Sequence, residues 1–114
     1  MADDSVPLCL TYLLKHQILH VIRSFKCPDT ERLANDERTA AFSLGVQRAG
    51  RRKLALLDSA TSLSDLRSPP GNRLEWLSGD RDGQHSVRVN DQFRLCFRWV
   101  DGDAYDVEIT DYHD

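Results

Sequence analysis

The sequence has few cysteines and no long apolar run, and these absences exclude several classes of protein. Its three cysteines, Cys9, Cys27 and Cys96, are scattered and form no C-x-x-C motif. We therefore expect neither a disulfide framework nor a zinc site, and a reducing cytoplasm is the expected location. The most apolar stretch, residues 6–22, contains lysine, glutamine and histidine. It is too short and too interrupted for a membrane span of about 20 apolar residues.

The sequence also lacks an excess of positive charge. Its 114 residues, the length of one ordinary domain, carry a formal net charge of −3 at pH 7, with a sequence pI near 5.7. Binding to nucleic acid through bulk charge is therefore not indicated. The charges are nevertheless segregated, because residues 23–53 are mainly basic and the charged residues from 101 onward are acidic. The overall charge therefore does not exclude a local basic site.

The first half of the chain predicts a strand and two helices. Residues 21–27 have the composition of a short strand, and Pro28 is well placed to begin a helix that ends near Asn35. Apolar residues at helical spacing predict a second helix from about Leu44 to Ala60. The Ser-, Pro- and Gly-rich connector that follows must interrupt any helix, and a brief extended piece is expected at residues 73–77.

The last third of the chain predicts three antiparallel strands. Apolar and polar side chains alternate along residues 86–114, which indicates one buried face and one open face. Turns at residues 90–92 and 101–103 keep apolar residues opposite one another. The apolar pairs expected from these turns are Val89 with Phe93 and Trp99 with Tyr105, with Val107 and Ile109 on the same face.

Arginines lie on the open face. The same register places Arg88 opposite Arg94 and Arg98 opposite Asp106, the latter an ordinary surface ion pair. Like charges that face each other across a sheet destabilise it. Either the side chains of Arg88 and Arg94 separate into water, or a phosphate binds between them, since guanidinium groups bind phosphate bidentately. Both interpretations stay open.

The end of the chain carries groups capable of acid–base chemistry. Histidine transfers protons near neutral pH, and tyrosine can stack on a base or donate a proton. His113 and Tyr112 therefore suggest catalysis, with Asp111 available to orient the imidazole. A histidine near a chain end is often only solvated, so this alternative also stays open. Residues expected in the core are His85, Trp76 and Trp99.

Residues 69–113, PPGNRLEWLSGDRDGQHSVRVNDQFRLCFRWVDGDAYDVEITDYH, resemble the HigB branch of the RelE/ParE toxin superfamily, whose members are also called plasmid maintenance system killer proteins. The motifs P-P-G-N-R-L-E, G-D-R-x-G, N-D-Q-F-R and D-Y-H carry the resemblance, which begins near Val21. It implies a RelE/ParE-like α+β toxin domain at residues 21–114, with an N-terminal strand and two helices on a mostly antiparallel sheet. Residues 1–20 are expected to be a dispensable extension or to precede the true start.

The resemblance implies a toxin of a type II toxin–antitoxin system. Such a toxin is a ribosome-dependent endoribonuclease that cleaves mRNA in the A site without a metal or cofactor, leaving 2′,3′-cyclic phosphate ends. The implied partners are a HigA-like helix-turn-helix antitoxin, the ribosome and mRNA, in the cytoplasm and away from membranes. Members of the ParE branch inhibit DNA gyrase, so a gyrase inhibitor stays open, as does a catalytically weak module that only binds its antitoxin.

The resemblance also implies site residues. Two arginines would hold the scissile phosphate and stabilise the transition state, with His113 in acid–base chemistry. Better-known relatives have a histidine and a lysine where this sequence has Glu75 and Ser78. Glu75 could be the general base, or the change could mark a weaker enzyme. The implied catalytic residues are Arg88, Arg94, Asp111, Tyr112, His113 and Glu75, and the implied RNA-binding residues are Arg73, Arg88 and Arg94.

Overall fold

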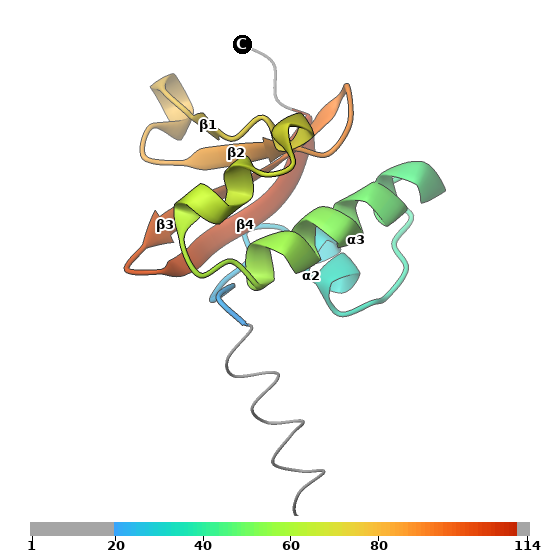
Figure 1. Ribbon diagram of the computed structural model, residues 1–114. Helices are drawn as coiled ribbons and strands as arrows, with labels where there is room; N and C mark the ends of the chain where they lie inside the picture. The colour runs from blue at the N-terminus through green and yellow to red at the C-terminus, as the bar shows by residue number, and fades with distance from the viewer. Residues whose placement is uncertain (1–19, 112–114) are drawn as a thin grey trace, which may run out of the picture.

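A computed structural model describes residues 20–111. All but the last residue of the N-terminal extension expected at 1–20 therefore lies outside the described residues, as do Tyr112 and His113. A four-stranded antiparallel sheet with strand order β1-β2-β3-β4 packs against two α-helices (Figure 1). The α+β architecture is therefore confirmed. The elements are α2 (Pro28–Ala34), α3 (Leu44–Asp58), β1 (Glu75–Trp76), β2 (His85–Arg88), β3 (Phe93–Val100) and β4 (Asp103–Asp111), with short 3-10 helices η1 (Leu63–Arg67), η2 (Pro70–Asn72) and η3 (Gly79–Arg81).

Both helices begin where the sequence predicts. Pro28 is the first residue of α2, where its missing N–H removes no helical hydrogen bond. The hydroxyl of Ser43 accepts a hydrogen bond from the backbone N–H of Val46 at 3.3 Å and thereby caps α3. Helix α3 ends at Asp58 rather than Ala60, a difference typical of helix ends.

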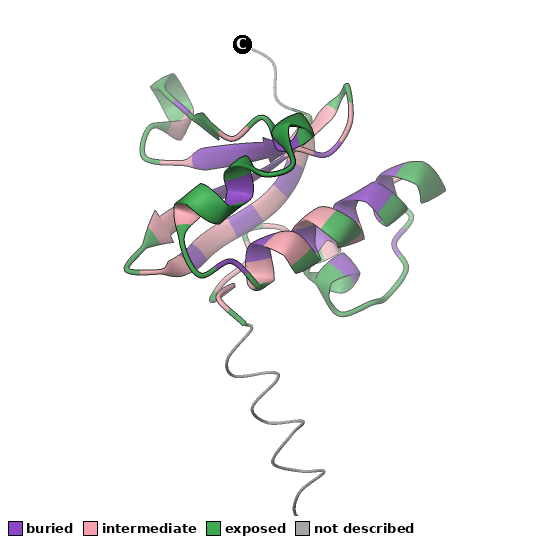
Figure 2. Ribbon diagram, in the orientation of Figure 1, coloured by how far each residue is buried: buried purple, intermediate pink, exposed green. Residues whose placement is uncertain are grey.

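Helix α3 packs closely on the sheet around Gly50. A Cβ atom at Gly50 would lie 2.8 Å from Cδ1 of Ile109 in β4, so the glycine permits this approach. Buried positions form one stripe along α3, whereas successive residues are buried along β2 and in the middle of β3 (Figure 2). The residues of the core include Leu33, Leu54, Leu57, Leu66, Val87, Leu95, Phe97, Ala104, Val107 and Ile109.

The predicted N-terminal strand is an extended segment with isolated parallel bridges rather than a regular strand. Ile22 pairs with Ala104 and Phe25 pairs with Val107 beside β4. Between these bridges the backbone N–H of Asp106 donates to Oγ of Ser24 at 2.8 Å. A side-chain bond therefore takes the place of a backbone bond and interrupts the ladder.

The predicted register of the second hairpin is wrong near its turn. Arg94 pairs with Thr110 as expected, but Trp99 pairs with Ala104, not with Tyr105. Asp101 and Gly102 have φ of 51° and 85°, which suits the two-residue turn that Asp-Gly favours. The register shift leaves one extra residue in β4, and a β-bulge at Asp106, whose φ is 54°, accommodates it.

The bulge changes which side chains of β4 enter the core. Ala104, with 0% exposure, takes the core position that had been assigned to Tyr105, which is only half-buried and lies opposite Arg98. The expected ion pair between Arg98 and Asp106 forms despite the shift, at 3.5 Å. In the described part of the chain, none of the helices has the length and apolar character needed to cross a membrane.

Candidate active site

Arg94 lies at the centre of the predicted site, and its guanidinium group is fixed in place. Its Nε donates to Oγ of Ser86 at 2.7 Å, and its Nη2 donates to the backbone carbonyl of Arg73 at 2.6 Å. The side chain is only 14% exposed. Its Nη1 makes no hydrogen bond to the described residues, so two N–H groups stay available for a ligand.

The turn that presents the Arg73 carbonyl is anchored by Asn72. This side chain is fully buried and donates to the carbonyls of Leu66 and Ser68, both at 3.2 Å. Its Oδ1 accepts a hydrogen bond from Nζ of Lys53 in α3. Arg73 itself has a φ of 46°, in the left-handed region. Helix α3 thus supports the loop on which Arg94 depends.

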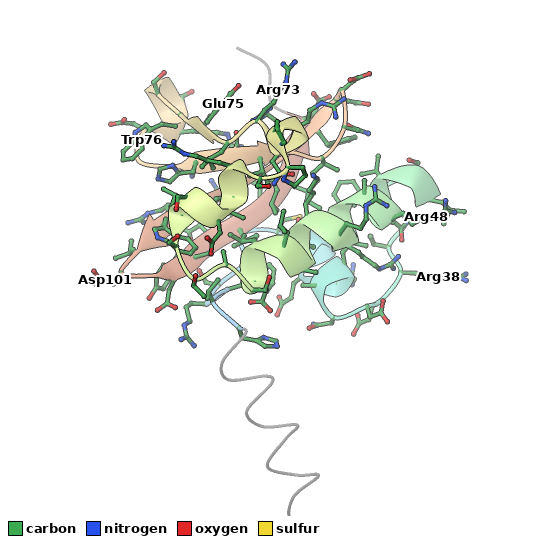
Figure 3. All side chains as sticks on the ribbon, viewed as in Figure 1. Arg38, Arg48, Arg73, Glu75, Trp76 and Asp101 are labelled. Carbon is green, nitrogen blue, oxygen red and sulfur yellow. The ribbon has the colours of Figure 1, made fainter. Side chains whose placement is uncertain are left out.

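Glu75 adds a carboxylate to the site. It pairs with Ser86 across β1 and β2, which places both side chains on the face that carries Arg94. Oε1 of Glu75 lies 3.7 Å from Nη2 of Arg94, and the side chain is 51% exposed. Figure 3 shows Arg73 and Glu75 projecting together from the sheet edge, away from Arg38 and Arg48. A half-exposed carboxylate next to a fixed guanidinium group can accept a proton from a substrate.

The predicted pair of Arg88 and Arg94 exists, and each of the two arginines also contacts an acceptor of the protein itself. The two residues are direct partners across β2 and β3. Arg88 forms an ion pair with Asp91, and Arg94 is held by Ser86, Arg73 and Glu75. Each arginine therefore has its own acceptor, which reduces the repulsion between them. Because Asp91 is 99% exposed, water screens its bond to Arg88, and a phosphate can displace it.

The face around these arginines is less open than the alternation suggests. Ser86 and Cys96 have 0% exposure on this side of the sheet. Arg81 forms an ion pair with Glu108 at 3.0 Å and closes the end of the face beyond Cys96. Burial raises the pKa of the Cys96 thiol, so this group is not a nucleophile of the site. Among the described residues, the end of this face that carries Glu75, Arg88 and Arg94 remains open to a ligand.

Lys53 extends the positive charge of the site toward α3. Burial lowers the pKa of its amine, and the charges of Arg52 and Arg88 lower it further. The electrostatic effect of Arg88 shows that the helix and strand cations share one region. Sequence reasoning missed Lys53 and Asn72, because their roles depend on a contact between α3 and the loop after η1. Within residues 20–111, no cluster of His, Cys, Asp or Glu side chains could hold a metal ion.

The predicted C-terminal group is only partly described. Asp111 pairs with Phe93 at the end of β4, and its Oδ2 accepts a hydrogen bond from Nε2 of Gln92 at 2.9 Å. By strand alternation, Asp111 is on the side of Ile109 rather than that of Thr110 and Arg94. Its expected contact with His113 cannot be placed, since Tyr112 and His113 lie outside the described residues.

The α+β fold, with two helices packed on a four-stranded antiparallel sheet, is consistent with that of a RelE-like toxin, and comparison with known proteins identifies the family. Residues 23–113 match the family described as the RelE-like toxin of the type II toxin–antitoxin system HigB, and the chain belongs to this family. Membership implies an antitoxin partner.

Named relatives agree with this assignment. The chain is 50% identical over 70 residues to Toxin HigB-1 of Vibrio cholerae serotype O1, a match that covers 61% of this chain and 74% of that protein. It is 36% identical over 61 residues to Endoribonuclease HigB of Proteus vulgaris, covering 54% and 65% of the two chains. An uncharacterised protein of Haemophilus influenzae is 38% identical over 53 residues, covering 46% and 52%.

Proposed function

We propose that this protein is an endoribonuclease toxin that cleaves mRNA in the ribosomal A site. The observation that carries the proposal is the pair of Arg94 and Glu75, with a partly buried guanidinium group 3.7 Å from a half-exposed carboxylate. The relative from Proteus vulgaris is named an endoribonuclease, which supports the same reaction class here.

The proposed reaction is an intramolecular transesterification of the phosphodiester bond between two nucleotides. Glu75 accepts the proton of the ribose 2′-OH, and the 2′-oxygen forms a bond to phosphorus. The bond from phosphorus to the 5′-oxygen breaks, and that oxygen takes a proton from His113. Arg94 and Arg88 bind the phosphate oxygens and stabilise the charge of the pentacoordinate transition state. The products are a 2′,3′-cyclic phosphate and a 5′-hydroxyl end, with no metal or cofactor.

The remaining predicted residues have supporting roles in this proposal. Arg73 binds the RNA backbone next to Arg94, to which its carbonyl is already bonded. Tyr112 stacks on a base or donates a hydrogen bond, and Asp111 assists His113. The position of Asp111 beside Gln92 favours an indirect contribution over direct contact with the phosphate.

Dependence on the ribosome follows from charge. A net charge of −3 gives free RNA little general attraction, so the ribosome must place the mRNA on the site. Arg48 and Arg52 are exposed on α3, and Lys53 connects that helix to the active-site arginines. These cations favour contact with structured RNA around the A site. The protein therefore acts in the cytoplasm, where a HigA-like helix-turn-helix antitoxin restrains it.

Cleavage of an mRNA in the A site of purified ribosomes tests the function. Wild type should cut the mRNA and leave a 2′,3′-cyclic phosphate, whereas the same RNA free in solution should remain largely intact. Equal cleavage of free and ribosome-bound RNA would refute the dependence on the ribosome. If the protein does not cleave the mRNA but inhibits DNA gyrase, its function is instead that of the ParE branch. Addition of the co-expressed antitoxin should abolish cleavage.

A further inference from the structure

A cavity of about 420 Å³ opens beside β1, on the sheet face that carries Trp76 and His85 and opposite the face that carries Arg94. Its volume lies in the usual range of small-ligand sites, about 300–1,000 Å³. Trp76 forms one wall and is 71% exposed, which corrects its expected place in the core. The residues that line the cavity are Leu63, Arg67, Leu74, Glu75, Trp76 and His85.

His85 is a largely buried residue that lines this cavity. It is 5% exposed, and its imidazole makes no hydrogen bond within the described part of the chain. Its contacts are with aromatic rings, since the ring of Trp76 meets it edge-on at 4.3 Å and Phe97 stacks on it at 5.9 Å. The imidazole therefore supplies one donor and one acceptor to a ligand.

The charged groups of the cavity define what kind of ligand it suits. Burial lowers the pKa of His85, so the imidazole is neutral at pH 7 and offers both functions at once. Arg67 is exposed at the rim and can bind a phosphate, and Glu75 can accept an amino proton. An indole face, a neutral donor–acceptor group and a cation together match a nucleotide better than an aliphatic side chain.

We propose that this cavity binds one nucleobase of the mRNA next to the cleaved bond, with the base stacked on Trp76 and its edge on His85. Glu75 belongs both to this cavity and to the pair with Arg94, so a strand with its phosphate at Arg94 reaches the cavity by passing around β1 at the edge of the sheet. Arg67 then contacts the neighbouring phosphate. The inference rests on the proposed ribonuclease function and adds a subsite to it.

A cycle of protein and RNA changes tests the subsite on programmed ribosomes. One set of mRNAs carries a single abasic nucleotide at each position around the cleaved bond. Wild type should lose about 5- to 150-fold in cleavage rate at one of these positions, the factor for loss of one base–aromatic stack. On normal mRNA, Trp76→Ala should cleave more slowly than wild type by a similar factor. On the mRNA with the sensitive abasic position, Trp76→Ala should cleave no more slowly than it cleaves normal mRNA. Val100→Ala, changed at another exposed apolar residue, is the matched control and should behave like wild type.

The outcomes distinguish this inference from the function on which it rests. No cleavage by wild type would refute the ribonuclease function itself. Normal cleavage by Trp76→Ala would overturn the subsite and leave the function intact. The subsite would also be overturned if the rate losses from Trp76→Ala and from the abasic nucleotide multiply when the two changes are combined. Such independence would mean that Trp76 does not contact that base. Trp76→Phe should recover part of the lost rate, since a smaller ring still stacks.

Discussion

Nη2 of Arg94 donates to the carbonyl of Arg73 at 2.6 Å and lies 3.7 Å from Oε1 of Glu75. The shorter contact fixes the guanidinium group, and the longer one places a half-exposed carboxylate beside it. A fixed cation beside an accessible base meets two needs of phosphate transfer, because charge must be stabilised where it develops and a proton must leave. The contributions of Arg94 and Glu75 to cleavage can therefore be measured separately by mutation.

Replacement of Arg94 should reduce both catalysis and stability. Arg94→Ala removes the phosphate donor and should lower the cleavage rate about 10²–10³-fold, by analogy with the loss of an oxyanion donor. It also leaves Ser86 and the Arg73 carbonyl without their partner, which should lower the free energy of unfolding by about 1–3 kcal/mol. Single-turnover cleavage on ribosomes and urea denaturation measure the two effects.

Arg98→Ala is the matched control for charge on the same strand. Arg98 is 54% exposed and has a single surface ion pair, with Asp106, so its loss should cost only about 0–1 kcal/mol. Its cleavage rate should stay close to that of wild type. A folded Arg94→Ala protein that cleaves as fast as Arg98→Ala would remove Arg94 from the site.

Replacement of Glu75 should separate the general base from the phosphate contact. Glu75→Gln keeps the size of the side chain but cannot accept a proton, and should lower the rate about 10²–10⁴-fold. His113→Ala should lose a similar factor by removing the acid. A folded Glu75→Gln protein that cleaves as fast as wild type in the single-turnover assay would assign the base elsewhere.

Much of the fold follows from local patterns in the sequence. Alternation identifies the strands, and Pro28 and Ser43 mark the starts of the helices. The register near the second turn does not follow, because Asp101-Gly102 favours a two-residue turn and Asp106 absorbs the extra residue in a bulge. Alternation alone cannot reveal a bulge, since it assumes a constant period of two.

The site is predictable only where it lies on the sheet. The pairing of Arg88 with Arg94 follows from strand alternation. The bond of Lys53 to Asn72 and that of Arg94 to the Arg73 carbonyl join segments far apart in the sequence, and no periodicity encodes them. The exposure of Trp76 is also unpredictable, because it arises from the position of β1 at the edge of the sheet.

Replacement of Asn72 should weaken the support of the Arg73 turn. Asn72→Ala leaves two carbonyls, those of Leu66 and Ser68, and the amine of Lys53 without their partner. The free energy of unfolding should fall by on the order of 1–3 kcal/mol for the buried groups. Cleavage should fall as well, because the displaced turn no longer fixes Arg94. Urea denaturation measures the first effect, with exposed Asn35→Ala as the control expected within about 0.5 kcal/mol of wild type.

Stability should fall as the pH drops below neutrality because of His85. Burial lowers the pKa of His85 in the folded protein below its ordinary value of about 6.5. Between these two values the unfolded chain binds a proton that the folded chain does not, so acid favours unfolding. The contribution is fully present above about pH 6.5 and is lost below it, with a slope of at most about 1.4 kcal/mol per pH unit for one proton. Urea denaturation from about pH 7.5 to about pH 5.5 covers this window and largely avoids carboxylate titration.

His85→Phe isolates this contribution, since it keeps an aromatic ring between Trp76 and Phe97 but binds no proton. Its free energy of unfolding should fall less steeply with acid than that of wild type. His20→Gln, changed at a residue with a 49% exposed side chain, should retain the fall caused by His85. Equal slopes in wild type and His85→Phe would show that the imidazole binds its proton equally well in both states.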